Sequence, residues 1–209
     1  MLTVALPKGR LMDKALELFD RAKIIETTNY GESRKLIIED NKADLRYILA
    51  KPTDVPTYVE YGVADIGIVG KDVLKENKRA VYELLDLGIG KCQMIVAVKS
   101  GSGFNKVQEL GFSAKVASKY PNCTTEYFRS HGIQAEIIKL NGSIELAPIV
   151  GLADAIVDIT ETGRTIAENG LEIIAEVFPI SARLIANQVS YKIHYHSLRE
   201  MVKALEEVI

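Results

Sequence analysis

The chain has 209 residues, of which 47% are hydrophobic, and this is enough to bury a core in one domain or in two small lobes. Its 26 basic and 28 acidic residues give a formal net charge of −2, which excludes the basic footprint of a nucleic-acid-binding protein, and no apolar run approaches membrane-spanning length. The two cysteines, Cys92 and Cys123, have neither metal-ligand nor redox spacing, and no secretory leader precedes the first strand, so we expect a soluble protein of the cytoplasm.

Short apolar runs alternate with helical patterns along almost the whole chain. This alternation is typical of an α/β protein with largely parallel sheets. The expected strands cover residues 2–6, 35–38, 45–50, 65–69, 82–85, 93–98, 115–118, 136–140, 155–159 and 172–178. The polar segment 39–44 separates two of these runs and predicts a β-hairpin, which would be an antiparallel exception.

Helices are expected between these strands, and the first and the last are the clearest. Apolar residues recur at helical spacing on one face of each. They are Leu11, Ala15, Leu18, Phe19 and Ala22 in the first helix, and Leu198, Met201, Val202, Leu205 and Ile209 in the last. Asn122 and Ser197 are predicted to be N-caps, and Asp54 and Pro56 to begin a short helix. The glycine-containing segment 88–90 is a weakly marked domain boundary that would divide the chain into two α/β lobes.

A basic turn, Lys8-Gly9-Arg10, lies between the first expected strand and the first helix. Two cations at a helix N-terminus oppose the positive end of the helix dipole, a mismatch of about 0.3–1 kcal/mol each when exposed. A bound anion would offset it, because Gly9 lets the backbone come close and Arg10 can donate two hydrogen bonds to a phosphate. The alternative is an ordinary solvated turn. Arg34 and Lys51 stand at strand ends, where charged side chains are usually just solvated.

The most informative segment is DAIVDITETGRT, residues 154–165. It predicts a buried strand that is followed by a hydroxyl-rich loop and a short helix. The free N–H groups of residues 163–165 and the helix dipole would favour a phosphate there, and the threonine hydroxyls could donate to its other oxygens. Asp158 and Glu161 only accept hydrogen bonds, so they suit a ligand with hydroxyl donors beside its phosphate, such as a ribose diol.

The same segment has a simpler explanation, and one class of phosphate loop is excluded. Thr165 and Glu168 fit a capping box, so the segment could be no more than a capped helix. A nucleotide P-loop would need a lysine and a longer glycine run, and neither is present. The two carboxylates, Gly163 and three threonines within six residues favour a ligand site over the capped helix.

The run from Glu145 through Gly151 and Asp158 to Thr165 resembles the signature of ATP phosphoribosyltransferase, the first enzyme of histidine biosynthesis. Three further segments are similar to that family: ALPKGRL at 5–11, SRKL at 33–36, and 54–70 with its DVPTYV and ADIGIVG. The similarity extends from residue 2 to the end of the chain. Ile166 departs slightly, because leucine or methionine is expected there, but an apolar exchange at a packing position changes no chemistry.

The resemblance implies an α/β fold with two lobes, like that of type II periplasmic binding proteins, and an active-site cleft between the lobes. Residues 1–90 and 180–209 would form the lobe on the pyrophosphate and ATP side, and residues 91–179 the lobe with the phosphoribosyl-binding loop. By this resemblance Lys8, Arg10 and Arg34 would be catalytic and bind pyrophosphate or ATP phosphates, and Lys51 would bind substrate, although arginine is more usual there. The other substrate contacts would come from Asp158, Thr160, Glu161, Thr162, Gly163, Arg164 and Thr165.

The reaction that the resemblance implies is a glycosyl transfer. Adenine N1 of ATP would attack C1 of phosphoribosyl pyrophosphate, giving phosphoribosyl-ATP and pyrophosphate. No Ser-His-Asp or Cys-His apparatus is required, because the adenine nitrogen already presents a lone pair. Mg²⁺ is the expected cofactor, held through the pyrophosphate of the substrate, since Mg²⁺ usually binds through phosphates and keeps several waters.

The resemblance also implies partners. A chain of this length has no room for the regulatory domain of the longer form, so we expect the short form, which self-associates as a dimer and works with a histidyl-tRNA-synthetase-like regulatory subunit in a hetero-oligomer. Two rival functions stay open. One is a non-catalytic solute-binding protein, against which the missing signal peptide counts. The other is a phosphoribosyltransferase with another acceptor base, since the phosphate loop does not specify adenine.

Overall fold

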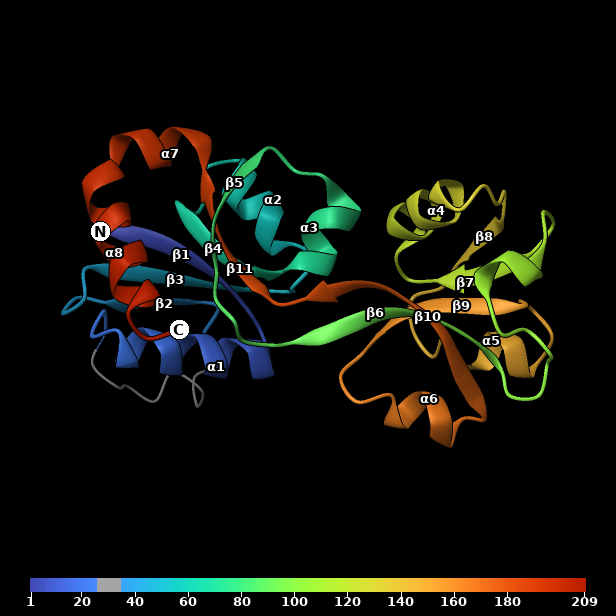
Figure 1. Ribbon diagram of the computed structural model, residues 1–209. Coiled ribbons are helices and arrows are strands. Elements are labelled where there is room, and N and C mark those ends of the chain that lie inside the picture. The colour runs from blue at the N-terminus through green and yellow to red at the C-terminus, as the bar shows by residue number, and fades with distance from the viewer. Residues whose placement is uncertain (26–34) are drawn as a thin grey trace. The chain divides into compact units, whose positions relative to one another are not determined.

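The computed structural model describes residues 1–25 and 35–209, which divide into two compact units, each built on one β-sheet (Figure 1). The first unit comprises Met1–Leu74, Lys78–Gly90 and Ser181–Ile209. The second comprises Lys75–Asn77 and Lys91–Ile180. The first unit is therefore assembled from both ends of the sequence.

The sheet of the first unit has six strands in the order β2-β3-β1-β4-β11-β5. They are β1 Leu2–Pro7, β2 Ile37–Asp40, β3 Leu45–Ala50, β4 Ile66–Gly70, β5 Val81–Asp86 and β11 Ala182–Asn187. β3, β1 and β4 run parallel, whereas β2 is antiparallel to β3, and β11 is antiparallel to β4 and β5. The predicted hairpin at 39–44 is confirmed, because Asp40 pairs with Leu45 where β2 meets β3.

Helices cover both faces of this sheet. They are α1 Arg10–Arg21, α2 Val55–Glu60, α3 Lys71–Asn77, α7 Gln188–Ile193 and α8 Tyr195–Glu206. The apolar faces of α1 and α8 bury Phe19 and Leu205 in one core with Leu6 of β1, as the helical spacing predicted. On the other face, Val59 of α2 and Val73 of α3 share a second core. The alternation of β1 side chains between these two cores is what makes the sheet the middle of three layers.

The second unit has a five-stranded sheet in the order β10-β6-β9-β7-β8. Its strands are β6 Cys92–Lys99, β7 Lys115–Ser118, β8 Glu136–Lys139, β9 Ala155–Thr160 and β10 Leu171–Ile180. Its helices are η2 Val107–Leu110, α4 Pro121–Ser130, α5 Leu146–Ile149 and α6 Arg164–Glu168. η2 and α4 contribute to the core on one face of the sheet, and α5 and α6 to the core on the other.

Both sheets are mixed, so the expectation of largely parallel sheets is wrong. In the ranges 1–25 and 35–209, four strand pairings are parallel and five are antiparallel. The parallel pairings form the β3-β1-β4 and β9-β7-β8 regions, and β6, β10 and β11 supply most of the antiparallel ones. β11 escaped prediction because only Ser181 separates it from β10, so no turn residues mark where one strand ends and the next begins.

Two predicted helix caps are also wrong. α8 begins at Tyr195, ahead of Ser197, and α4 begins at Pro121 with Tyr120 in the cap position. The first N–H groups of α4 are instead satisfied by Glu76, in the last turn of α3, which belongs like α4 to the second unit. The carboxylate of Glu76 accepts from the N–H groups of Asn122 and Cys123 at 3.1 and 3.0 Å. A carboxylate 46 residues away in the sequence thus caps the positive end of α4, where a neighbouring residue was expected to do so.

An ion-pair network in the first unit joins β5 to β11. Asp86 accepts hydrogen bonds from the Gly88 N–H at 3.0 Å and the Ser181 hydroxyl at 2.7 Å, and it pairs with the guanidinium of Arg183. Burial acts to raise the pKa of Asp86, but these three partners together outweigh it and leave the pKa below its ordinary value. The charged form of Asp86 therefore stabilises the folded unit.

Candidate active site

Three of the predicted cations lie at the carboxyl ends of adjacent parallel strands in the first unit. Lys8 follows β1, Lys51 follows β3, and Arg10 opens α1. The two strand ends are adjacent because β1 pairs with β3, and the N–H of Lys8 donates to the carbonyl of Ala50 at 2.9 Å. All three cationic side chains are exposed, and none of them forms an ion pair with another described residue. We call this group, Lys8, Arg10 and Lys51, the basic edge.

Gly9 sits at the centre of the basic edge in a conformation that favours glycine. Its φ is 104° and its ψ is −165°, and it is the N-cap residue of α1. A Cβ at this position would meet no atom within 4 Å, so the backbone conformation, rather than lack of space, calls for glycine. Because glycine has no side chain, it provides no side-chain cap for α1. The positive end of the helix dipole and the two flanking cations therefore act at one place.

The remaining predicted cation, Arg34, lies outside the described residues, so its role stays a prediction.

The family-like segment 54–70 has a structural explanation. Asp65 accepts from the Thr3 N–H at 2.8 Å and from the Ser190 hydroxyl at 2.7 Å, which ties the starts of β1 and β4 to α7. Gly67 gives α2 room, because a Cβ there would lie 2.8 Å from a methyl group of Val59.

Residues 154–165 fold as the predicted strand, loop and short helix. β9 ends at Thr160, and α6 begins at Arg164. The apolar start of the strand is fully buried, whereas Asp158 and Thr160 are half-buried and the loop residues 161 and 162 are exposed. β9 is parallel to β7, so this loop too follows the carboxyl end of a parallel strand. We call residues 160–165 the threonine loop.

The threonine loop makes hydrogen bonds within itself. The Gly163 N–H donates to Thr160 Oγ1 at 2.9 Å, and the Arg164 N–H donates to Thr162 Oγ1 at a longer 3.4 Å. The expectation that both N–H groups are free is therefore wrong, because two threonine hydroxyl oxygens already accept from them. Asp158 Oδ1 likewise accepts from the Ile159 N–H at 2.8 Å. The loop is preorganised by its own side chains.

The capping-box alternative is also wrong. Gly163, in the left-handed conformation with φ 74°, is the N-cap of α6, so Thr165 lies inside the helix and does not precede it. Glu168 Oε1 accepts instead from Arg164 Nε at 2.7 Å, an exposed i,i+4 ion pair. Such pairs contribute only about 0.3–0.5 kcal/mol, so the side chain of Arg164 is easily released to a ligand.

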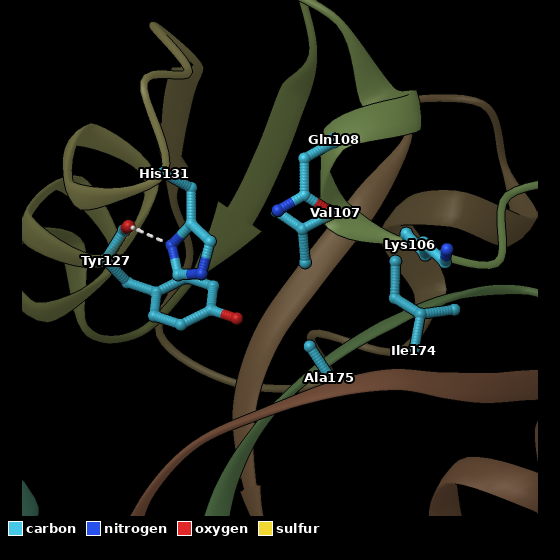
Figure 2. A pocket seen from close by; sticks show the side chains of 7 residues that line it. All are labelled: Lys106, Val107, Gln108, Tyr127, His131, Ile174 and Ala175. Carbon is cyan, nitrogen blue, oxygen red and sulfur yellow. Dashed lines mark hydrogen bonds between the residues drawn. The ribbon is translucent and has the colours of Figure 1, made fainter.

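A hollow of about 190 Å³ in the second unit contains none of the predicted site residues (Figure 2). His131 lines it at the end of α4, and its Nδ1 lies 2.9 Å from the carbonyl oxygen of Tyr127. A carbonyl only accepts, so Nδ1 carries a proton and its interaction closes the last turn of the helix. The lining residues are Lys106, Val107, Gln108, Tyr127, His131, Ile174 and Ala175.

Neither a metal cluster nor a membrane helix is found in the part of the chain that the structure describes. No group of three or more His, Cys, Asp or Glu side chains is placed to hold a metal ion there. No described helix is both long enough and apolar enough to cross a bilayer.

Comparison with known proteins identifies the family. The ATP phosphoribosyltransferase family model matches residues 51–207. The ATP phosphoribosyltransferase of Geobacillus sp. (strain WCH70) is 53% identical over 209 residues, which are all of this chain and 99% of that protein. This chain belongs to the ATP phosphoribosyltransferase family. The enzyme is a pentosyltransferase of the first step of histidine biosynthesis, and the full-length match is to its short form.

Further relatives support the family, and solved structures support the fold. The protein of Caldicellulosiruptor bescii is 52% identical over 210 residues, covering 100% of this chain and 99% of its own. The ATP phosphoribosyltransferase (HisG:HisZ) complex from Thermotoga maritima contains a chain that is 39% identical, with a TM-score of 0.82 and coverage of 100% and 98%. The periplasmic aliphatic sulphonate binding protein SsuA from Escherichia coli has a TM-score of 0.65 at 12% identity, covering 99% of this chain and 68% of that one. This last likeness confirms the predicted α/β fold class of type II periplasmic binding proteins and concerns the fold alone.

Proposed function

We propose that the threonine loop holds the 5′-phosphate of phosphoribosyl pyrophosphate and that the basic edge holds its pyrophosphate or the phosphates of ATP, while adenine N1 attacks C1 of the ribose. One observation supports this assignment above the others. In each unit the polar residues follow the carboxyl ends of parallel strands, where open α/β sheets bind their ligands. Family membership supplies the two substrates.

The threonine loop is suited to a phosphate that replaces its internal acceptors. The N–H groups of Gly163 and Arg164 now donate to hydroxyl oxygens, and a phosphate oxygen is a stronger, charged acceptor for the same donors. Once displaced, the hydroxyls of Thr160 and Thr162 can rotate and donate to the phosphate themselves. The loop therefore exchanges neutral hydrogen bonds for charge-assisted ones without a change of backbone.

The two carboxylates are placed to recognise the sugar. Asp158 lies two residues before Thr160 on β9, so both side chains are on the same face of the sheet. Glu161 is exposed at the start of the loop. Carboxylates repel a phosphate but accept hydrogen bonds from hydroxyl groups, so we assign Asp158 and Glu161 to the ribose hydroxyls beside the phosphate.

The basic edge is suited to the leaving group. As the bond at C1 breaks, negative charge develops on the departing pyrophosphate, and prepositioned cations stabilise it. The three side chains of the basic edge can do this without first breaking an ion pair to any residue within 1–25 or 35–209. Mg²⁺ fits as an ion carried on the pyrophosphate, because it keeps several waters and the described residues contain no metal cluster. When bound, the ion would supply further neutralisation of the pyrophosphate charge.

The proposal extends to the partners and the location of the chain. The T. maritima relative was solved as a HisG:HisZ complex, which supports a second subunit for this chain. From the sequence resemblance we propose that this subunit is histidyl-tRNA-synthetase-like and regulatory, and that the chain also self-associates as a dimer. Neither cysteine of the chain forms a disulfide, which is consistent with a reducing cytoplasm.

Incubation of the pure chain with ATP, phosphoribosyl pyrophosphate and Mg²⁺, with and without the regulatory subunit, tests the proposal. Formation of phosphoribosyl-ATP that stops when Mg²⁺ is chelated is the expected result. Product from another base but not from ATP would correct the acceptor. No product in either incubation would contradict the assignment of both substrates.

A further inference from the structure

One more polar side chain lies beside the threonine loop. Gln93, near the start of β6, pairs directly with Thr160 in the antiparallel ladder between β6 and β9. Residues paired in this way have side chains on the same face of the sheet, with Cβ atoms about 4.5–5.5 Å apart. The side chains of Gln93 and Thr160 are therefore neighbours.

The core clusters show which face these side chains share. Ile95, two residues after Gln93, and Ile156, four residues before Thr160, belong to one buried cluster with Ile166 of α6. Side chains in a strand alternate between faces, so Gln93 and Thr160 lie on the face that α6 covers. This is the face on which the threonine loop enters its helix, and Gln93 is on the side of the proposed phosphate.

The carboxamide of Gln93 is available for a ligand. The residue is half-buried, and its side chain forms no hydrogen bond with any residue in the ranges that the structure describes. A carboxamide offers two N–H donors and an accepting oxygen, so this side chain can donate to a ligand without first giving up a hydrogen bond within the described residues. A neutral donor in this position would add to the donors of the threonine loop without forming an ion pair with Asp158.

We propose that Gln93 is a substrate-binding residue whose Nε2 donates to an oxygen of the phosphate held by the threonine loop. This rests on the proposed function, and it adds a contact from β6 to a site otherwise built from β9 and α6. The contact favours a phosphorylated ribose over an unphosphorylated one, because its acceptor is an oxygen of the phosphate. It has no effect on ATP, whose phosphates are assigned to the basic edge.

Steady-state kinetics of Gln93→Ala and Gln93→Glu test the proposal. A hydrogen bond to a charged group contributes about 1.5–3 kcal/mol, so we expect KM for phosphoribosyl pyrophosphate to rise about tenfold or more in Gln93→Ala. Gln93→Glu should be worse, since a carboxylate cannot donate and repels the phosphate. KM for ATP and the melting temperature should stay unchanged. Gln108→Ala, which removes an exposed glutamine of η2, is the matched control and should behave as the wild type.

The inference and the proposed function fail in different ways. A wild-type chain that makes phosphoribosyl-ATP while both Gln93 variants keep its KM for phosphoribosyl pyrophosphate overturns the inference alone. A lower melting temperature with unchanged KM also overturns it, because it shows a purely structural role. If Gln93→Glu does not fold, Gln93→Asn, with a shorter carboxamide, takes its place and should raise the same KM. A wild-type chain that shows no binding of phosphoribosyl pyrophosphate by calorimetry overturns both.

Discussion

Replacing Arg10 by alanine should separate catalysis from stability. Arg10 is exposed, forms no ion pair with a described residue, and stands at the positive end of α1. Its removal breaks no ion pair with a described residue and relieves a dipole mismatch of about 0.3–1 kcal/mol, so the free energy of unfolding should stay constant or rise slightly. If it stabilises the departing pyrophosphate, the lost bond is worth about 1.5–3 kcal/mol. We therefore expect kcat/KM to fall by about 10–150-fold.

The assay follows phosphoribosyl-ATP formation, and urea unfolding measures stability in parallel. Lys14→Ala is the matched control, because Lys14 is an exposed cation one turn further along α1. It should leave kcat/KM unchanged. Equal kinetics for Arg10→Ala and the wild type would remove Arg10 from the site. An equal loss in Lys14→Ala would show that general positive charge on α1, rather than the basic edge, attracts the substrate.

Three further predictions concern other parts of the chain. Gly163→Val forces a β-branched residue into a φ of 74°, at roughly 1–2 kcal/mol, and should weaken binding of phosphoribosyl pyrophosphate while the protein stays folded; equal affinity by calorimetry would remove the threonine loop from the site. Burial, with Glu76 beside it, raises the pKa of Cys123 to about 12, so in a Cys92→Ser variant iodoacetamide should modify the remaining thiol only after denaturation. The folded-state pKa of Asp86 is below its ordinary value, so Asp86→Asn should lower the free energy of unfolding at neutral pH, and the difference from the wild type should vanish as the pH falls through that pKa. A pH-independent difference in urea unfolding would contradict the role of its charge.

Local patterns were sufficient to predict most elements of the fold. β7 was expected at 115–118 and lies there, because a short apolar run bounded by polar residues is typical of a buried strand. The faces of α1 and α8 followed from helical spacing for the same reason. The antiparallel direction of β6 and β10 was missed, since a buried strand has the same apolar sequence pattern whether its neighbour is parallel or antiparallel.

Interactions over long sequence separations were beyond such patterns. The cap of α4 comes from Glu76, 46 residues before Asn122, and no local motif indicates it. The order of strand, loop and helix around Gly163 was predictable from the residues of this segment. The hydrogen bond from the Gly163 N–H to Thr160 Oγ1 was not predictable, because it depends on the rotamer of the threonine side chain. Gln93 was missed because its significance lies only in its register with β9.

The place of β11 has a consequence for synthesis of the chain. Among the described strands β5 pairs only with β11, and β11 also pairs with β4, so β11 joins β5 to the rest of its sheet. On the ribosome, all of β6 to β10 is made before residues 182–187 emerge. The second unit can therefore fold on a nascent chain in which β4 and β5 still lack their partner β11, and unpaired strand edges are where partly made proteins aggregate. A truncation before Ala182 would make that vulnerable intermediate permanent.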